Sequence, residues 1–235
     1  MRRCRVAVVA LSCRCRCAGY RSLESSSMES EPDIEQEAYE WLRGHLSGFL
    51  RFDGERIPLK IAPLPDGRFV APVMVAMQIA ADTVLELPDD GDGDLHLMVS
   101  LEKFDERTET GGSADRWRIY HGDPPDVNWA FITIDASKYH GYFIDGEVFL
   151  RPNTLDNGGA PICRTLNQTQ IAEVRAAIYT QFRADSEAPV VVGVDQGGFD
   201  VRRQFDLIRL TAPKGVVITD QASAVATLAT LAKNA

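Results

Sequence analysis

The pattern of apolar and polar positions divides the chain into a helix, a strand-rich stretch and a mixed tail. Near the start, Ile34, Ala38, Trp41, Leu42, Leu46 and Phe49 follow helical spacing. Acidic residues gather in the first turn, where the helix dipole favours negative charge. We therefore expect an amphipathic helix over 34–49 that packs on a sheet.

Short apolar runs separated by turn residues follow this helix. The first two pairs are divided by Pro65-Asp66-Gly67 and by an Asp- and Gly-rich run at 88–94, so each pair predicts a hairpin. A short helix at 114–120 should end at Gly122, before two prolines. The expected strands are 56–64, 69–77, 83–87, 95–101, 127–135, 139–144 and 147–150. Six or seven strands joined in this way predict a small antiparallel barrel.

The tail has a different pattern. A Pro-, Asn- and Gly-rich stretch, 151–160, is the expected linker. Asn167 is expected to cap a helix that carries Ile171, Val174, Ile178 and Phe182, and Asp220 to cap a final helix. Strands are expected at 190–194, 199–202 and 205–210. The predicted division is a leader (1–27), a barrel domain (28–150), the linker and a small α/β domain (161–235).

The leader differs from the rest in composition. Residues 1–27 hold six arginines, one acid and four of the five cysteines, so the other 208 residues carry 19 basic and 33 acidic groups, a net −14. Three interpretations stand: a secretory signal, a metal site on Cys13, Cys15 and Cys17, or an unstructured leader upstream of a start at Met28. The apolar run is short and arginines follow it, and the cysteine spacing is not that of zinc sites. We favour the third.

Composition limits the function classes. With 235 residues, 45% hydrophobic and 25% charged, the chain has the composition of a soluble globular protein. The net charge of −9 argues against binding to nucleic acid, which needs clustered cations. No apolar run reaches the roughly 18 residues of a membrane span. Cys163 is the only cysteine after the leader, so no disulfide is expected there and a cytoplasmic setting is predicted.

One cluster of residues suggests a binding site. Arg116, Trp117, Arg118, Tyr120 and His121 lie within six positions, and such side chains can grip a phosphate and stack on a flat ring. The alternative is an ordinary helix end, where cations offset the dipole.

Other single residues are weaker candidates for the same role. His140 lies on an expected barrel strand, and Lys60 and Arg68 are further phosphate candidates. The acidic run at 89–94 has some oxygen ligands of a calcium loop but lacks the closing glutamate, so a solvated turn is expected and no metal site is predicted. No motif identifies a catalytic residue.

The tail also carries a recognisable signature. Gly193-Val194-Asp195-Gln196-Gly197-Gly198-Phe199-Asp200-Val201-Arg202 resembles the Gly-Val-Asp-x-x-Gly-Phe-Asp-x-Arg signature of the α/β domain that follows a split barrel in haem-utilisation proteins and plastid glutamyl-tRNA reductase-binding proteins. Upstream, 129–135 and 139–142 are similar to the last long strands of such a barrel. The resemblance implies an α+β chain: a six- to seven-stranded antiparallel split barrel of the pyridoxamine-phosphate-oxidase-like, FMN-binding type, followed by a small α/β domain.

The resemblance also implies a homodimer with a cofactor site near the subunit boundary, holding FMN or haem. One stretch departs from it: where haem-utilisation relatives carry Met-Asn-x-Asp-His, this chain has Leu166-Asn167-Gln168-Thr169-Gln170, and Thr169 and Gln170 do not ionise. Haem breakdown through those groups is therefore not expected. Two hypotheses follow: an FMN- or haem-binding protein of the oxidoreductase-like group with an unassigned reaction, or a cofactor-free dimeric binding or regulatory module.

Overall fold

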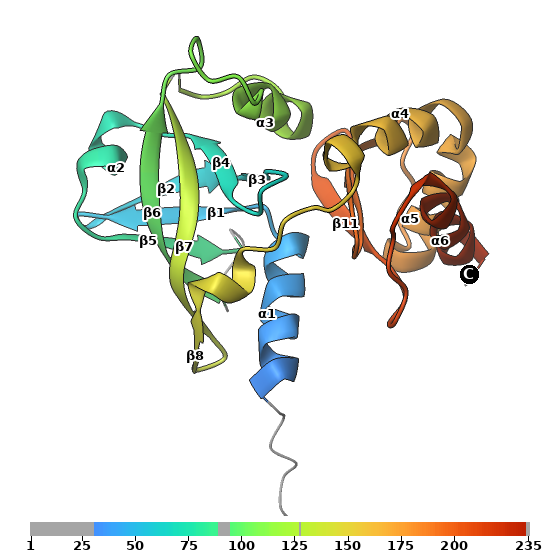
Figure 1. The fold of residues 1–235 in the computed structure, drawn as a ribbon, viewed down its shortest axis with the longest axis horizontal. Helices are drawn as coiled ribbons and strands as arrows, with labels where there is room; N and C mark the ends of the chain where they lie inside the picture. Colours follow the sequence, from blue (N-terminus) through green and yellow to red (C-terminus); the bar gives the residue numbers. More distant parts are fainter. Residues whose placement is uncertain (1–30, 89–94, 127, 234–235) are drawn as a thin grey trace, which may run out of the picture.

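The computed structural model describes residues 31–88, 95–126 and 128–233. The leader and the acidic run at 89–94 lie outside the described residues. Figure 1 shows two parts: a curled sheet with helix α1 (Glu31–Gly44) beside it, and a smaller unit of helices and strands.

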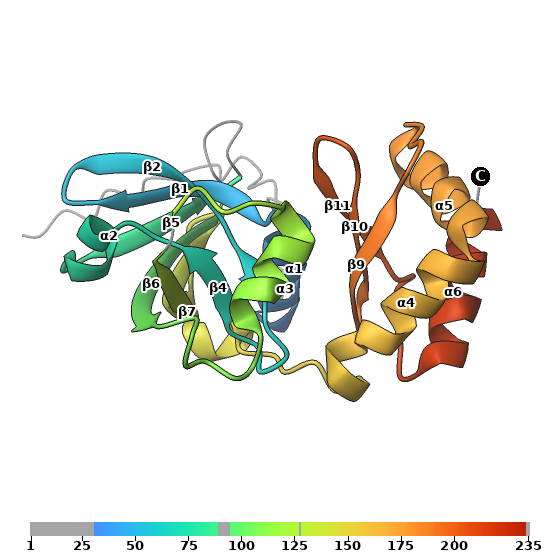
Figure 2. The ribbon, with the colours of Figure 1, turned by 90° about the horizontal axis from the view of Figure 1, so that it is seen from above.

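The larger part is an antiparallel sheet of eight strands. Seven follow the order β2-β1-β5-β6-β7-β4-β3, and β8 pairs with β7. All pairs are antiparallel. The strands are β1 (Ser47–Phe52), β2 (Glu55–Lys60), β3 (Ala62–Pro63), β4 (Phe69–Pro72), β5 (Thr83–Leu87), β6 (Leu95–Phe104), β7 (Trp129–Tyr139) and β8 (Tyr142–Asp145). The sheet curls around its apolar face (Figure 2), which confirms the predicted split-barrel fold.

The curled sheet encloses a packed core. Helix α1 and helix α3 (Ser113–His121) contribute to it, together with the short helix α2 (Val75–Ile79) and the 3₁₀ helix η1 (Gly146–Phe149). Trp117 of α3 and Trp129 of β7 are both fully buried and meet edge to face, with ring centroids 5.8 Å apart. Aromatic and branched side chains therefore fill the interior, as close-packed protein cores require.

The smaller part has its own apolar core. Its sheet has the order β11-β10-β9, formed by β9 (Val190–Asp195), β10 (Gly198–Arg202) and β11 (Leu207–Thr211). Its helices are η2 (Asp156–Gly159), α4 (Ala160–Thr169), α5 (Ile171–Phe182) and α6 (Gln221–Lys233). The α-helices cover one face of the sheet, and the other face is turned toward the barrel (Figure 2). As predicted, Asp220 caps α6 by accepting a hydrogen bond from the Ser223 amide at 2.7 Å.

Tertiary pairing changes three of the predicted elements. The first helix ends at Gly44 rather than 49, because the chain from Ser47 joins the sheet as β1. Gly48 lies so close to Glu86 of β5 that a side chain there would overlap its carbonyl. The strand expected over 69–77 ends at Pro72, and helix α2 follows. The strand expected to end at 135 continues to Tyr139 as β7.

Two local predictions in the later sequence are wrong. The strand expected at 147–150 is the 3₁₀ helix η1, because Asp145 accepts from the Glu147 amide at 2.9 Å and starts a turn. Asn167 is not a helix cap. It lies inside α4, where its amide group exchanges two hydrogen bonds of 2.8 Å with the backbone of Val191, so it attaches the helix to β9.

Candidate functional site

Helix α3 carries two of the predicted ligand residues, and both are bonded to the barrel. Arg116 donates through Nε to the carbonyl of Pro63, and His121 bonds through Nε2 to the carbonyl of Ile61 at 2.8 Å. Between them, Trp117 donates to the carbonyl of Lys60 at 2.8 Å. Three side chains of one helix thus donate hydrogen bonds to backbone carbonyls of segment 60–63. This gives the donor side chains of α3 a structural role.

His121 is neutral in the folded protein. Burial lowers its pKa to about 4, although the bond to the Ile61 carbonyl acts in the opposite direction. A carbonyl oxygen only accepts, so Nε2 carries the proton. A neutral imidazole has no positive charge to attract a phosphate, and the N–H of His121 already donates to a carbonyl.

The structure separates the remaining predicted site residues. His140 follows the last residue of β7, in a turn where its φ is 47°, and its ring lies 4.2 Å from that of Tyr139. Helix α3 contacts the other end of β7, roughly 30 Å away along an 11-residue strand. Arg68 pairs with Asp66 at 2.8 Å and lies over the Phe131 ring. Within one chain, Lys60, Arg116 and His121 are brought together around α3, and His140 is not.

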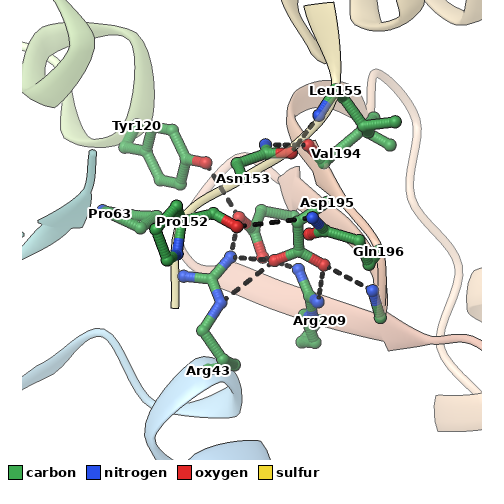
Figure 3. A network of polar contacts seen from close by, with 12 residues as sticks. Arg43, Pro63, Tyr120, Pro152, Asn153, Leu155, Val194, Asp195, Gln196 and Arg209 are labelled. Atoms are coloured by element: carbon green, nitrogen blue, oxygen red, sulfur yellow. Dashed lines mark hydrogen bonds and ion pairs between the residues drawn. The ribbon is translucent and has the colours of Figure 1, made fainter. Parts of the chain in front are cut away.

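A network that the sequence did not reveal lies between the two parts (Figure 3). Nη2 of Arg43, on α1, lies 2.9 Å from Oδ2 of Asp195 and 2.8 Å from Oδ2 of Asp200. Arg209 of β11 bonds to the other oxygen of each aspartate, at 2.8 Å for Asp200. The Tyr120 hydroxyl of α3 donates to Asp200 at 2.8 Å. Two strands of the tail therefore hold two helices of the barrel part.

Burial and charge act against each other in this network. Burial alone would raise the pKa of Asp195 and Asp200, but Arg209 and Arg43 outweigh it and hold both pKa values below the ordinary range. Burial raises the pKa of Tyr120 well above its ordinary value, and Asp200 adds to the effect, so the phenol stays protonated. The network therefore contains two carboxylates, two guanidiniums and one neutral phenol, and its net charge is zero.

The signature residues of the tail build this network rather than an exposed catalytic pair. Asp195 and Asp200 are the two acids of the signature, and both are buried. Gly193 is required beside them, because a side chain there would overlap the Tyr120 hydroxyl and approach Asp200. Oδ1 of Asp195 also accepts from the Gly197 amide at 2.8 Å, which fixes the β9–β10 turn.

Two of the cavities between the described residues adjoin the barrel. One of about 20 Å³ lies at the junction with the tail and is polar, lined by Arg43, Arg116, Arg151 and the two network aspartates among others. The other, of about 90 Å³, is mostly apolar and lies between β4, β7 and η1, with Arg68 at its edge. Sites for drug-sized ligands measure roughly 300–1,000 Å³. The flavin ring of FMN or a haem therefore does not fit either cavity within one chain.

A metal site, a reactive thiol and a membrane-spanning helix are all absent from the described part of the chain. No group of three or more His, Cys, Asp or Glu side chains there is arranged to hold a metal ion. Burial raises the pKa of the Cys163 thiol to about 12, which leaves it unreactive at neutral pH. Within the same residues, every helix is too short or too polar to cross a bilayer.

Comparisons with known proteins bear on the fold. No protein-family model and no curated protein sequence matches the chain. A protein of unknown function from Agrobacterium tumefaciens strain C58 is 16% identical over 90% of this chain and 100% of its own, with a TM-score of 0.64. A haem-binding protein from Mycobacterium smegmatis, also 16% identical, covers 87% of this chain and 98% of its own with a TM-score of 0.36, too low to bear on this chain. The likeness to the Agrobacterium protein concerns the fold alone, and membership of the pyridoxamine-phosphate-oxidase-like family is not shown.

Proposed function

We propose that the protein is a dimeric binding module of split-barrel fold, which acts through contacts between macromolecules and keeps no ring cofactor inside its barrel. The observation that carries this proposal is the filled interior. Trp117, Trp129 and the apolar side chains around them occupy the space that a planar guest would need. Of the predicted phosphate ligands, His121 is engaged with a backbone carbonyl, and Arg116 donates to another through Nε alone.

The outer face of the barrel offers a surface for a second copy of the chain. Strand register places Met98 of β6 opposite Ala136 of β7, and Phe143 of β8 opposite Lys138 of β7, all on one face. Met98 is 49% exposed and Phe143 is 82% exposed. Glu86, His96 and Lys138 form one cross-strand row beside them, and the acid at one end and the lysine at the other can pair across a twofold axis. Glu86 would then share its carboxylate with Arg51 and Arg56, which it already contacts.

A second candidate function is the binding of FMN or haem. The cavity of about 90 Å³ is mostly apolar and has Arg68 at its edge, one of the residues predicted to hold a phosphate. A second chain placed over its mouth would enlarge it, and FMN or haem would then bind at the subunit boundary. Arg68 would have to exchange its bond to Asp66 for one to the cofactor.

Absorption spectroscopy separates the two candidates. The full chain is titrated with FMN and with haemin, and each mixture is passed through a desalting column. The binding-module proposal predicts no shifted flavin band, no sharpened Soret band and no colour that elutes with the protein. A flavin or haem that elutes at one per chain would refute it and support the second candidate. In that case Arg68→Gln should weaken binding, whereas Arg203→Gln in the tail, also a paired surface arginine, should not.

A further inference from the structure

The polar cavity at the junction of the two parts has the features of an anion site. It is lined by side chains from α1, α3, the segment after η1 and the end of β9, among them Tyr39, Arg43, Arg116, Tyr120 and Arg151. We propose that it binds a phosphate group, either as inorganic phosphate or as the phosphoryl end of a small phosphomonoester.

One of the arginines that line this cavity carries an unpartnered donor. The Arg43 side chain is 6% exposed, and its Nε and Nη2 bond to the network aspartates. Its third nitrogen, Nη1, is buried and has no hydrogen-bond partner among the described residues. In Figure 3 this nitrogen points away from the aspartates, toward Pro63 and Pro152. A buried donor left unsatisfied costs about 1–3 kcal/mol, so an acceptor is needed there.

The charge around the cavity favours an anion over a neutral acceptor. Arg116 and Arg151 bond through Nε to the carbonyls of Pro63 and Val148. Across the described ranges, neither has a carboxylate within ion-pair distance, whereas Arg43 and Arg209 are balanced by Asp195 and Asp200. Four guanidiniums against two carboxylates leave two positive charges, which match a phosphate dianion. Guanidinium N–H groups are well suited to phosphate oxygens.

The dimensions define how such a group would enter. A volume of about 20 Å³ accommodates little more than one water-sized atom. One phosphate oxygen therefore fits the cavity, which Arg43 lines. Arg116, Arg151 and Gln196 also line the cavity and are half-buried, so the remaining oxygens and any ester carbon would lie toward these three side chains. The site admits a phosphate group but excludes a ring, so it is independent of the proposed function.

Calorimetric titration of the full chain with inorganic phosphate, and with glycerol 3-phosphate, tests this assignment at constant ionic strength. We expect one site per chain. Arg151→Gln should weaken binding at least about tenfold, since a charge-assisted bond contributes on the order of 1.5–3 kcal/mol. Arg203→Gln, a paired arginine of the tail hairpin that does not line the cavity, should change the affinity less than about twofold.

Each outcome has a defined meaning. Tighter binding of glycerol 3-phosphate indicates a phosphorylated small molecule, and tighter binding of inorganic phosphate indicates the free ion; both support the site. No heat, and no rise in the unfolding midpoint at about 10 mM phosphate relative to chloride, would mean that water alone satisfies Arg43 and would overturn the proposal. Equal weakening by Arg151→Gln and Arg203→Gln would overturn it as well, since binding would then be non-specific. If Arg151→Gln fails to fold, Arg151→Lys replaces it and should also lower the affinity.

Discussion

Nη2 of Arg43 lies 2.8 Å from Oδ2 of Asp200, although 157 positions separate the two residues in the chain. Both side chains are buried, and Arg209 and Asp195 complete the network. A buried ion pair contributes little net free energy when intact, but removing one member leaves the other charged and uncompensated. This asymmetry makes the network sensitive to single substitutions.

Replacing Asp200 by Asn should lower the free energy of unfolding by about 3 kcal/mol, because two buried guanidiniums lose a counter-charge. Urea unfolding followed by tryptophan fluorescence measures the change. The matched control is Asp206→Asn, which breaks the exposed pair with Arg203 and should cost less than about 1 kcal/mol. Equal losses in the two variants would mean that burial adds nothing to the importance of Asp200.

A methyl group at Gly193 should disturb the same network from the backbone side. In Gly193→Ala the new Cβ would overlap the Tyr120 hydroxyl, so Tyr120 must leave Asp200. We expect a loss of about 2–4 kcal/mol, in the range for overpacking combined with a broken buried hydrogen bond. Gly44→Ala is the control, because no atom lies within 4 Å of its added Cβ, and it should leave stability unchanged or slightly higher. Thermal unfolding of both variants measures the change. An unchanged unfolding midpoint for Gly193→Ala would contradict the packing argument.

Stability should depend on pH through His121. Its pKa is about 4 in the folded protein and near 6.5 in the unfolded chain, so the unfolded state takes up a proton first as the pH falls. The contribution is complete above pH 6.5 and is lost as the pH falls toward 4, by up to roughly 1.4 kcal/mol per pH unit. His121→Gln should flatten the profile of unfolding free energy between pH 6.5 and 4. An NMR titration that places the ring pKa near 6.5 in the folded protein would contradict the burial argument.

The outer face of the barrel should control association. Met98→Lys introduces a charge beside Lys138 and Phe143, and we expect it to shift the protein from dimer to monomer in light scattering. Phe205→Ser serves as the control, since Phe205 is 89% exposed in the tail hairpin, away from this face. It should leave the mass unchanged. A wild-type chain that is monomeric at every concentration would refute this part of the proposed function.

Local sequence patterns predicted the barrel well, because alternation, turns and caps are short-range signals. The Pro65-Asp66-Gly67 turn, the end of α3 at Gly122 and the cap at Asp220 depend on neighbouring residues alone. The first helix was extended too far because 47–52 forms β1, which pairs with β5 across 35 positions. It also pairs with β2 through the tight turn at Asp53-Gly54, a local signal that the prediction did not use.

The ion-pair network between the barrel and the tail was harder to predict, because its members lie far apart in the sequence. Arg43 lies inside the helix expected over 34–49, and no residue near it in the sequence indicates partners in the tail. In the structure it lies in the last turn of α1, where a cation also offsets the helix dipole. The signature singled out Asp195 and Asp200 but not their role. Backbone carbonyls accept from the same N–H groups that would bind a phosphate, as His121 and Nε of Arg116 show, and this use depends on tertiary contacts rather than on neighbouring residues.

Hydrogen exchange of the full chain tests most directly whether the network makes the tail and the barrel one cooperative unit. In the wild type, amides of β9 and β10 should exchange with the same urea dependence as those of β7, because both parts open together. In Arg43→Met, β9 and β10 should lose at least about tenfold more protection than β7, since the tail then opens by itself. If the tail already opened independently in the wild type, or if Arg43→Met left the two parts coupled, the network would not be what joins them.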